Sequence, residues 1–325
     1  MLLVVNAGSS SVKLALFDKG ALVDSHNVAQ LGAGGHEAAL AQGLAAMGAP
    51  VFSAAAHRVV HGGEGLTATC RVTDDILAKI TAAVPLAPLH NPANLACIHA
   101  LARLHPDLPQ FAAFDTAFHA TIPAKEYLYA LPASDAQAGG LRRYGFHGLS
   151  YASMVRRLRP NLPRRLLGLH LGNGASLCAI LDGKSVATTM GHSPQDGLIM
   201  GTRAGTIDSA AVLTLARRHG IDGAEALLSR GSGLLALSGS HDMRRATPAA
   251  REMFTHAVLR HAGAMVALMG GLDGAVFSGG IGENDGALRG AIIAGLAFLG
   301  PFASHVLPAE EERQIALDVA ALGAA

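Results

Sequence analysis

Charged side chains interrupt apolar segments at two early points of this 325-residue sequence. In AAAHRVVHGGEG, Arg58 stands beside a valine pair that runs into a double glycine, and in FAAFDTAFHATIP, Asp115 stands inside an aromatic-flanked run. An arginine can clamp a phosphate or carboxylate through two parallel hydrogen bonds, and a buried carboxylate is costly unless it is paired. Two plainer interpretations stay open, in which Arg58 is a solvated surface residue and Asp115 caps a strand end.

Two further polar residues lie beside glycines in the second half of the chain. His147 occurs in RRYGFHGLSY, and Arg203 occurs in MGTRAGTID. Together with Arg58 and Asp115 they form a set of two arginines, an aspartate and a histidine. This is the set expected for phosphoryl transfer, which depends on positioning and on neutralisation of phosphate charge.

The amino-terminal NAGSSSVKL has the composition of a phosphate-binding loop, so its structural setting matters. A Walker A loop needs a second glycine where this sequence has Lys13, and it must lead into a helix. Here the pattern predicts strands at residues 4–6 and 12–17, joined as a hairpin. The stretch is therefore expected to be a glycine-rich hairpin and not a P-loop.

A second hairpin of the same kind is predicted at residues 166–184. LLGLHLGNGASLCAILDGK overlays residues 2–20 at a constant offset, and both segments read as strand, Gly-rich turn and strand. Such self-similarity indicates a duplicated architecture. We therefore expect two similar domains with a cleft between them.

A third glycine-rich element, GAVFSGGIGEND, predicts a strand that breaks at Gly279 and Gly280 before a helix begins. The start of a helix offers free backbone N–H groups to anions, so this setting is common in nucleotide sites. A long helix is predicted before it, with Thr247 as its cap and Pro248 in its first turn. The apolar stripe of that helix is expected in the core; it comprises Phe254, Val258, Ala262, Met265 and Met269.

Composition limits the class of protein and of partner. The chain is 50% hydrophobic and 15% charged with a formal net charge of +1, which indicates a well-packed globular protein without a basic field for nucleic acid or membranes. The three cysteines are far apart and form no CxxC pair, which favours a reducing cytosol. The apolar segment 290–303 is too short to span a membrane and is expected in the core.

The ordered motifs NAGSSSVK, HRVVHGGE, APLHNPAN, FDTAFH, RRYGFHG, HLGNGAS, GTRAG, SGGIGEN and EEERQIALD resemble those of the acetate kinase family. That family belongs to the acetate and sugar kinase, Hsc70 and actin superfamily. The resemblance implies an α/β fold with two lobes, duplicated ribonuclease-H-like cores and a central cleft. It places the metal and substrate side in residues 1–118 and 311–325, and it places nucleotide binding and dimer contacts in residues 119–310.

The resemblance also implies the reaction, which is reversible in-line transfer of the ATP γ-phosphoryl group to acetate, giving acetyl phosphate and ADP. Mg²⁺ is the implied metal, with Mn²⁺ as an alternative. The implied partners are ATP and acetate or another short-chain carboxylate, without nucleic acid or membrane. A cytoplasmic homodimer is the implied form of the protein.

Site roles carry over motif by motif. The catalytic residues implied are Arg58, Asp115, His147 and Arg203. The metal residues implied are Asn6 and Glu311, with Glu310 and Glu312 as alternatives in register. The acyl pocket implied consists of Arg58, Val60, Leu89, Phe146 and Pro194. The nucleotide residues implied are Lys13, His170, Gly172, Asn173, Gly174, Asp242, Arg244, Gly279, Gly280, Ile281 and Asn284.

Three segments depart from the family pattern, namely GFHGLSY, GHSPQDG and GTIDS. His192 and Gln195 add polarity beside Pro194, and Thr206 replaces a carboxylate three residues from Arg203. A propionate-preferring kinase is the nearest alternative, because one methylene group in an apolar pocket discriminates by only about 1–3 kcal/mol. An alternative of another class is a nucleotide-binding sensor or chaperone-like ATPase that has lost acyl transfer.

Overall fold

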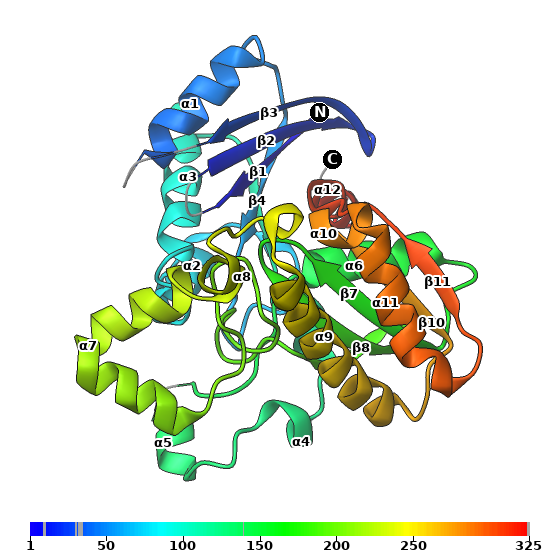
Figure 1. Ribbon diagram of the computed structural model, residues 1–325. Coiled ribbons are helices and arrows are strands. Elements are labelled where there is room, and N and C mark those ends of the chain that lie inside the picture. Colours follow the sequence, from blue (N-terminus) through cyan, green and yellow to red (C-terminus); the bar gives the residue numbers. More distant parts are fainter. Residues whose placement is uncertain (9–10, 30, 32–34, 139, 324–325) are drawn as a thin grey trace. The chain divides into compact units, whose positions relative to one another are not determined.

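The computed structural model describes residues 1–8, 11–29, 31, 35–138 and 140–323 (Figure 1). Ser9 and Ser10 of the first glycine-rich turn lie outside the described residues. The chain divides into two compact units. Unit 1 comprises residues 1–120, 148–153 and 310–325, and unit 2 comprises residues 121–147 and 154–309.

Unit 1 contains a six-stranded sheet of order β3-β2-β1-β4-β6-β5. The strands β1, β4 and β6 are parallel, while β2, β3 and β5 run antiparallel to their neighbours. The predicted hairpin is confirmed, because β1 pairs with β2 in an antiparallel register from Leu2 opposite Phe17 to Ala7 opposite Val12. The strands are β1 (Leu2–Ala7), β2 (Ser11–Asp18), β3 (Ala21–Ala29), β4 (Ala54–Val59), β5 (Cys70–Arg71) and β6 (Gln110–Phe114).

Unit 2 contains a five-stranded sheet of order β11-β10-β7-β8-β9. Its β7-β8-β9 meander, with β10 and then β11 added in parallel beside β7, repeats the arrangement of β1-β2-β3 with β4 and β6. The second predicted hairpin and the duplication are thereby confirmed. The strands are β7 (Arg165–Leu171), β8 (Ala175–Leu181), β9 (Lys184–Thr188), β10 (Gly274–Ser278) and β11 (Ala303–Val306).

Helices cover both faces of the sheet in unit 1. Alternating side chains of β1 point to opposite faces, so that Val4 packs with Ile315 of α12 while Val5 packs with Leu40 and Leu101 of α1 and α3. The helices are α1 (His36–Ala46), α2 (Asp74–Ala82), α3 (Asn91–Leu104) and α12 (Glu311–Ala321), with the 3₁₀ turns η1 (Val84–Leu86) and η2 (Ala117–Thr121).

The long predicted helix of unit 2 is confirmed as α9. The Thr247 hydroxyl accepts a hydrogen bond from the Ala250 amide at its start, and all five residues of the predicted stripe are buried. α11 lies beside α9 (Figure 1). The helices are α4 (Ala124–Tyr127), α5 (Ala133–Ala138), α7 (Ser209–Arg230), α8 (Gly233–Ser238), α9 (Pro248–Met269), α10 (Gly279–Asn284) and α11 (Gly286–Leu296), with η3 (Met243–Arg245) and η4 (Ala297–Leu299); α6 (Gly148–Leu158) has residues in both units.

The expectation that segment 290–303 lies wholly in the core is wrong. Only Ile292 and Leu296 are buried, whereas Phe298 is 79% exposed. The segment is a helix followed by a 3₁₀ turn, and a helix on the outside of a sheet buries only one stripe of its surface. Among the described residues, every helix is too short or too polar to be a candidate for crossing a membrane.

Candidate active site

Arg58 and Asp115 form an ion pair in unit 1. Arg58 lies near the carboxyl end of β4, and Asp115 directly follows the neighbouring parallel strand β6. Arg58 Nε donates to Asp115 Oδ1 at 3.0 Å and to Oδ2 at 3.1 Å, and Nη2 also donates to Oδ2. The side chains are 17% and 2% exposed. The interpretation of Arg58 as a solvated surface residue is therefore wrong.

The first residues of α12 bring two more carboxylates to this pair. Glu312 Oε1 accepts a hydrogen bond from Asn6 Nδ2 at 2.9 Å, and Glu312 Oε2 accepts one from Lys13 Nζ at 3.0 Å. Arg58 Nη1 donates to Asn6 Oδ1 at 3.0 Å, while Arg58 Nε lies 3.8 Å from Glu311 Oε2. We call the resulting group the arginine–carboxylate cluster; it comprises Asn6, Lys13, Arg58, Asp115, Glu311 and Glu312.

The charged groups of this cluster lie close enough to shift one another's pKa. The pKa of Glu311 is raised to about 7, chiefly by burial and also by the charges of Asp115 and Glu312, against the opposing effect of Arg58. Burial alone would raise the pKa of Glu312, but Lys13 and Asn6 outweigh it and the pKa is lowered. Burial alone would lower the pKa of Arg58, but the neighbouring carboxylates outweigh it and the pKa is raised. Three carboxylates thus share two cations.

The oxygen atoms of the arginine–carboxylate cluster are ligands of the kind that Mg²⁺ prefers. Mg²⁺ prefers oxygen ligands and usually binds through one or two carboxylates together with substrate phosphates. Asp115, Glu311 and the amide oxygen of Asn6 are oxygen donors of this kind. Within the described residues, no group of three His, Cys, Asp or Glu side chains is arranged to hold a metal ion by itself. These oxygen donors fit a metal that is shared with phosphates.

In unit 2, His147 and His170 lie against the second glycine-rich hairpin. Their rings stack with centroids 4.1 Å apart, and His147 Nδ1 is 2.9 Å from the Ser176 hydroxyl oxygen. A side chain at Gly174 would place its Cβ 3.3 Å from His147 Nε2 and 3.6 Å from Arg203 Nη1. The glycine therefore leaves space in which the His147 and Arg203 side chains can approach one hairpin.

Arg203 differs from Arg58 in having no carboxylate beside it. Its Nη1 donates to the Pro194 carbonyl oxygen at 2.9 Å, and it forms no ion pair with any residue in the described part of the chain. Burial lowers the pKa of Arg203, because a guanidinium removed from water loses solvation. The group is therefore a partly buried cation that lacks a counter-ion among the residues that the structure describes.

Unit 2 contains one cavity of about 760 Å³ and another of about 690 Å³. Several residues of the predicted nucleotide set line the smaller cavity. Of the predicted set, that cavity is lined by Gly172, Asn173, Asp242, Arg244, Gly280, Ile281 and Asn284. Gly279 lies behind it, with a positive φ of 78° and a Cβ position only 2.7 Å from the Leu171 carbonyl oxygen. At this position only glycine fits without strain.

The cavity also has lining residues that the sequence did not reveal, namely His241, Met243, Arg251 and Asp285. Arg251 Nη2 donates to Asp285 Oδ2 at 2.6 Å, which connects the first turn of α9 to the residue before α11. Asp242 accepts hydrogen bonds from Arg244, and these lower the pKa of Asp242 to about 2. Asp285 directly follows the SGGIGEN motif, and this position in the sequence could have indicated that Asp285 lines the cavity.

The remaining predicted residues have varied surroundings. Lys13 joins the arginine–carboxylate cluster in unit 1. Two of the residues expected to line the acyl pocket are in unit 1, where Val60 is 4% exposed and Leu89 is 43% exposed. Phe146 and Pro194 are in unit 2, and Phe146 is 2% exposed.

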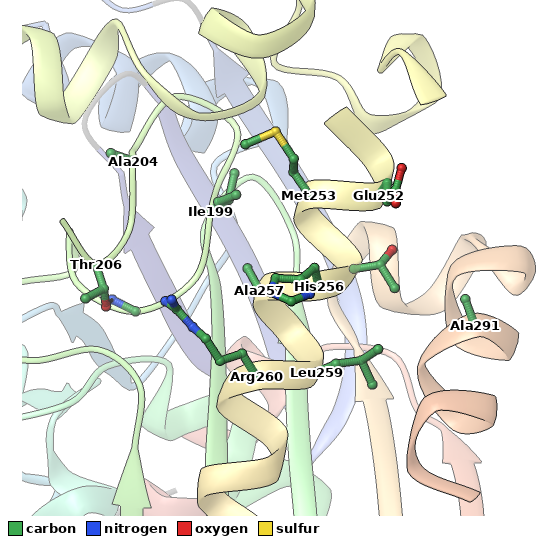
Figure 2. Close-up of a pocket in the computed structure, with 12 residues that line it drawn as sticks. Ile199, Ala204, Thr206, Glu252, Met253, His256, Ala257, Leu259, Arg260 and Ala291 are labelled. Atoms are coloured by element: carbon green, nitrogen blue, oxygen red, sulfur yellow. Dashed lines mark hydrogen bonds between the residues drawn. The ribbon is translucent and has the colours of Figure 1, made fainter. Parts of the chain in front are cut away.

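The larger cavity lies between α9 and the loop of residues 197–206 (Figure 2). Ile199 and Ala204 contribute apolar surface from the loop, and Met253, Ala257 and Leu259 contribute it from the helix. Its lining contains none of the predicted site residues. Size alone therefore does not identify the catalytic centre in this unit.

Two sheets with the same strand order, each opened by a glycine-rich hairpin, define the duplicated ribonuclease-H-like fold of the actin-like ATPases. The hairpin that supplies Gly172 and Asn173 to the 690 Å³ cavity also has Gly174 close to Arg203, and a fixed cation at such a hairpin suits a phosphotransferase of this class. Residues 50–314 match the model of the Acetokinase family. The chain belongs to this family.

Individual relatives agree with that family. Acetate kinase of Streptomyces avermitilis is 40% identical, with 92% of this chain and 85% of that protein covered. Propionate kinase of Citrobacter rodentium is 46% identical over 75% of this chain and 65% of that protein. The crystal structure of Porphyromonas gingivalis acetate kinase superposes with a TM-score of 0.91 at 32% identity, covering 99% of each chain.

Proposed function

We propose that this protein transfers the γ-phosphoryl group of ATP to acetate, giving acetyl phosphate and ADP in a reversible reaction. The observation that carries the proposal is the partly buried Arg203 guanidinium, which has no counter-ion among the described residues. It lies 3.6 Å from the Cβ position of Gly174, and the same hairpin supplies Gly172 and Asn173 to the 690 Å³ cavity. A nucleotide in that cavity would bring its phosphates to the hairpin.

The phosphoryl group would move in line between two oxygens. The bond from the γ-phosphorus to the β,γ-bridging oxygen breaks, a bond from an acetate oxygen to phosphorus forms, and ADP leaves with the electron pair. Charge gathers on the three equatorial oxygens in such a transition state. Arg203 and His147 flank one glycine of the hairpin and are the groups proposed to stabilise that charge.

No strong general base is required, because acetate is already ionised at neutral pH. The bidentate contact with Arg58 fixes the Asp115 carboxylate, which supports a role in orientation and not in proton removal. Asp115, Glu311 and Asn6 would hold Mg²⁺, or Mn²⁺ as an alternative, with Glu312 beside them. When bound, the metal neutralises phosphate charge.

The acyl chain is proposed to meet Val60 of unit 1, which is buried. Relatives named acetate kinase and propionate kinase both match this chain, so a propionate preference is the second candidate. Comparison of kcat/KM for acetate, propionate and butyrate separates the two. Val60→Ala should raise the propionate to acetate ratio about tenfold, in keeping with one methylene group in an apolar pocket.

The decisive test of the proposed reaction is a hydroxamate assay for acetyl phosphate with acetate and MgATP. Formation of acetyl phosphate together with ADP, dependent on acetate, supports the proposal. Tight ATP binding without acetyl phosphate or propionyl phosphate contradicts it and favours the sensor or chaperone-like ATPase.

A homodimer in the cytoplasm is the proposed form of the protein. α7 exposes Leu213 by 55% and Ile221 by 78%, which is apolar surface that a second copy would cover. The free thiols of Cys70, Cys97 and Cys178 suit a reducing compartment. Light scattering of the purified protein measures the mass directly, and a monomer at micromolar concentration contradicts the dimer.

A further inference from the structure

The loop that carries Arg203 is closed by a group of hydrogen bonds three residues from the guanidinium. The Thr206 amide donates to the Gly197 carbonyl oxygen at 3.0 Å, and the Gly197 amide lies 3.2 Å from the Thr206 hydroxyl oxygen. The Thr206 hydroxyl in turn donates to Asp196 Oδ1 at 2.8 Å, and the Gly197 amide donates to the same oxygen at 2.8 Å. We call Asp196, Gly197 and Thr206 the loop clasp.

Arg143 anchors the loop clasp to the end of β9. Its Nη1 lies 3.4 Å from Asp196 Oδ2 and donates to the carbonyl oxygens of Thr188 and Met190 at 3.2 and 3.1 Å. The Arg143 side chain is 19% exposed. One arginine therefore joins the carboxylate of the clasp to the backbone that leaves the sheet.

The clasp encloses Arg203 itself and adjoins the residue that holds its guanidinium. Pro194, whose carbonyl oxygen accepts from Arg203 Nη1 at 2.9 Å, stands two residues before Asp196. The Met200 amide donates to the Arg203 carbonyl oxygen at 3.1 Å inside the loop. Opening the clasp would release both the segment that bears the guanidinium and the segment that bears its acceptor.

The hydrogen bond from the Thr206 hydroxyl to Asp196 is accessible to water. Thr206 is exposed and lines the edge of the 760 Å³ cavity, where Arg260 extends toward it from α9 (Figure 2). Water can replace a hydrogen bond that is exposed in this way, so the bond contributes little to the free energy of unfolding. Its main effect is therefore expected on the position of the loop and not on the stability of the fold.

We propose that Thr206 and Asp196 are positioning residues, which fix Arg203 for contact with the transferred phosphoryl group by closing its loop. The proposal rests on the proposed function of Arg203. Misplacement of a catalytic group by about 1 Å can cost roughly 100-fold in rate. Loss of the Thr206 hydroxyl should therefore lower kcat, while nucleotide binding in the 690 Å³ cavity is retained.

The test is a double-mutant cycle between Thr206→Val and Arg203→Ala. Thr206→Val should lower kcat about tenfold and leave the Kd for ATP within about twofold. Thr206→Ser should recover at least about half of the wild-type kcat, because it restores the hydroxyl group. In the Arg203→Ala background, Thr206→Val should change kcat by less than about twofold, since the group it positions is gone.

Thr255→Val is the matched control. Thr255 lines the same cavity, but its hydroxyl donates to the Arg251 carbonyl oxygen of its own helix at 2.8 Å. This variant should keep the wild-type kcat. If Thr206→Val does not fold, Asp196→Asn takes its place in the cycle, with a smaller loss expected because the amide oxygen still accepts hydrogen bonds.

The possible failures are distinguishable. An unchanged kcat in Thr206→Val, or an equal loss with and without Arg203, overturns the positioning role even when Arg203→Ala itself is severely impaired. An unchanged kcat in Arg203→Ala instead contradicts the proposed function of Arg203, on which the positioning role depends.

Discussion

Arg58 and Arg203 are both held at the edge of a glycine-containing turn, but their surroundings differ in one decisive respect. Arg58 in unit 1 has a built-in counter-ion in Asp115 and lies 3.8 Å from Glu311. Among the described residues, the partners of Arg203 in unit 2 are the Pro194 carbonyl oxygen and, in a weak contact at 3.5 Å, the Met200 sulfur. A cation that is neutralised internally is suited to structure and orientation, whereas one without a counter-ion is suited to an anionic ligand.

The largest effect is expected in unit 1, where removal of a partner leaves a buried charge. Asp115→Ala should lower the free energy of unfolding by about 3–5 kcal/mol, because Arg58 then keeps its charge without its hydrogen-bonded carboxylate and is left with Glu311 at 3.8 Å. Asp115→Asn preserves the shape and should lose turnover with a smaller loss of stability. Urea denaturation and the hydroxamate assay measure the two quantities.

The double variant Arg58→Met/Asp115→Leu is the control for that experiment. Because both charges are removed, it should recover most of the lost stability while turnover stays absent. Near-normal turnover in Asp115→Asn would show that the carboxylate has no part in the reaction.

In unit 2 the same kind of deletion should affect the reaction and not the fold. Arg203→Ala should raise the barrier by about 2–4 kcal/mol, since a preorganised donor to the transition state is lost. Its midpoint of thermal unfolding should stay close to wild type, because no buried carboxylate is left unpaired. A large loss of stability in Arg203→Ala would make the two arginines alike and so abolish the comparison.

A third effect is a pH dependence of stability that arises from the buried His57 imidazole of unit 1. His57 precedes Arg58 on β4 and is 1% exposed. Burial lowers the pKa of His57 to about 4, although the hydrogen bond with Gln110 acts to raise it. Its Nε2 contacts Gln110 Oε1 at 2.7 Å, while Nδ1 has no hydrogen-bond partner among the described residues. A proton on Nδ1 would therefore be buried without an acceptor.

The sign of the pH dependence follows from this lowered pKa. Between pH 6.5 and about 4 the unfolded chain binds a proton at His57 that the folded chain does not. Stability from this site is complete above the unfolded pKa and is lost as the pH falls, by about 3 kcal/mol in total. Urea titrations from neutral pH downward measure the slope, and His57→Leu/Gln110→Leu should flatten it. An equally steep slope in that variant would assign the effect to other groups.

The smallest effect separates two contacts of Glu312. Asn6 bridges Arg58 and Glu312 in a part-buried setting, whereas Lys13 is 47% exposed. Exposed ion pairs contribute little, so Asn6→Ala should weaken Mg²⁺-dependent turnover by about 1 kcal/mol and Lys13→Ala by less. Turnover measured across a Mg²⁺ titration tests this order. The reverse order would return NAGSSSVKL to the P-loop interpretation.

Local sequence patterns were sufficient for the backbone framework. Alternating apolar residues and glycine-rich turns predicted the β1-β2 and β7-β8 hairpins, and Thr247 with its apolar stripe predicted α9. These features depend on residues a few positions apart, where the strand period and helix capping act directly. The error at segment 290–303 arose because composition does not show which stripe of a helix faces the sheet.

Local sequence patterns did not predict which polar residues form hydrogen bonds or ion pairs with one another. Asn6 meets Glu312 across 306 positions of sequence, Arg58 meets Asp115 across 57, and Arg143 meets Asp196 across 53. The sequence by itself determined which residue types are present, where strands turn and how the chain is duplicated. Only the tertiary structure decided that Arg58 is neutralised and Arg203 is not, because charge pairing depends on distances that chain folding alone creates.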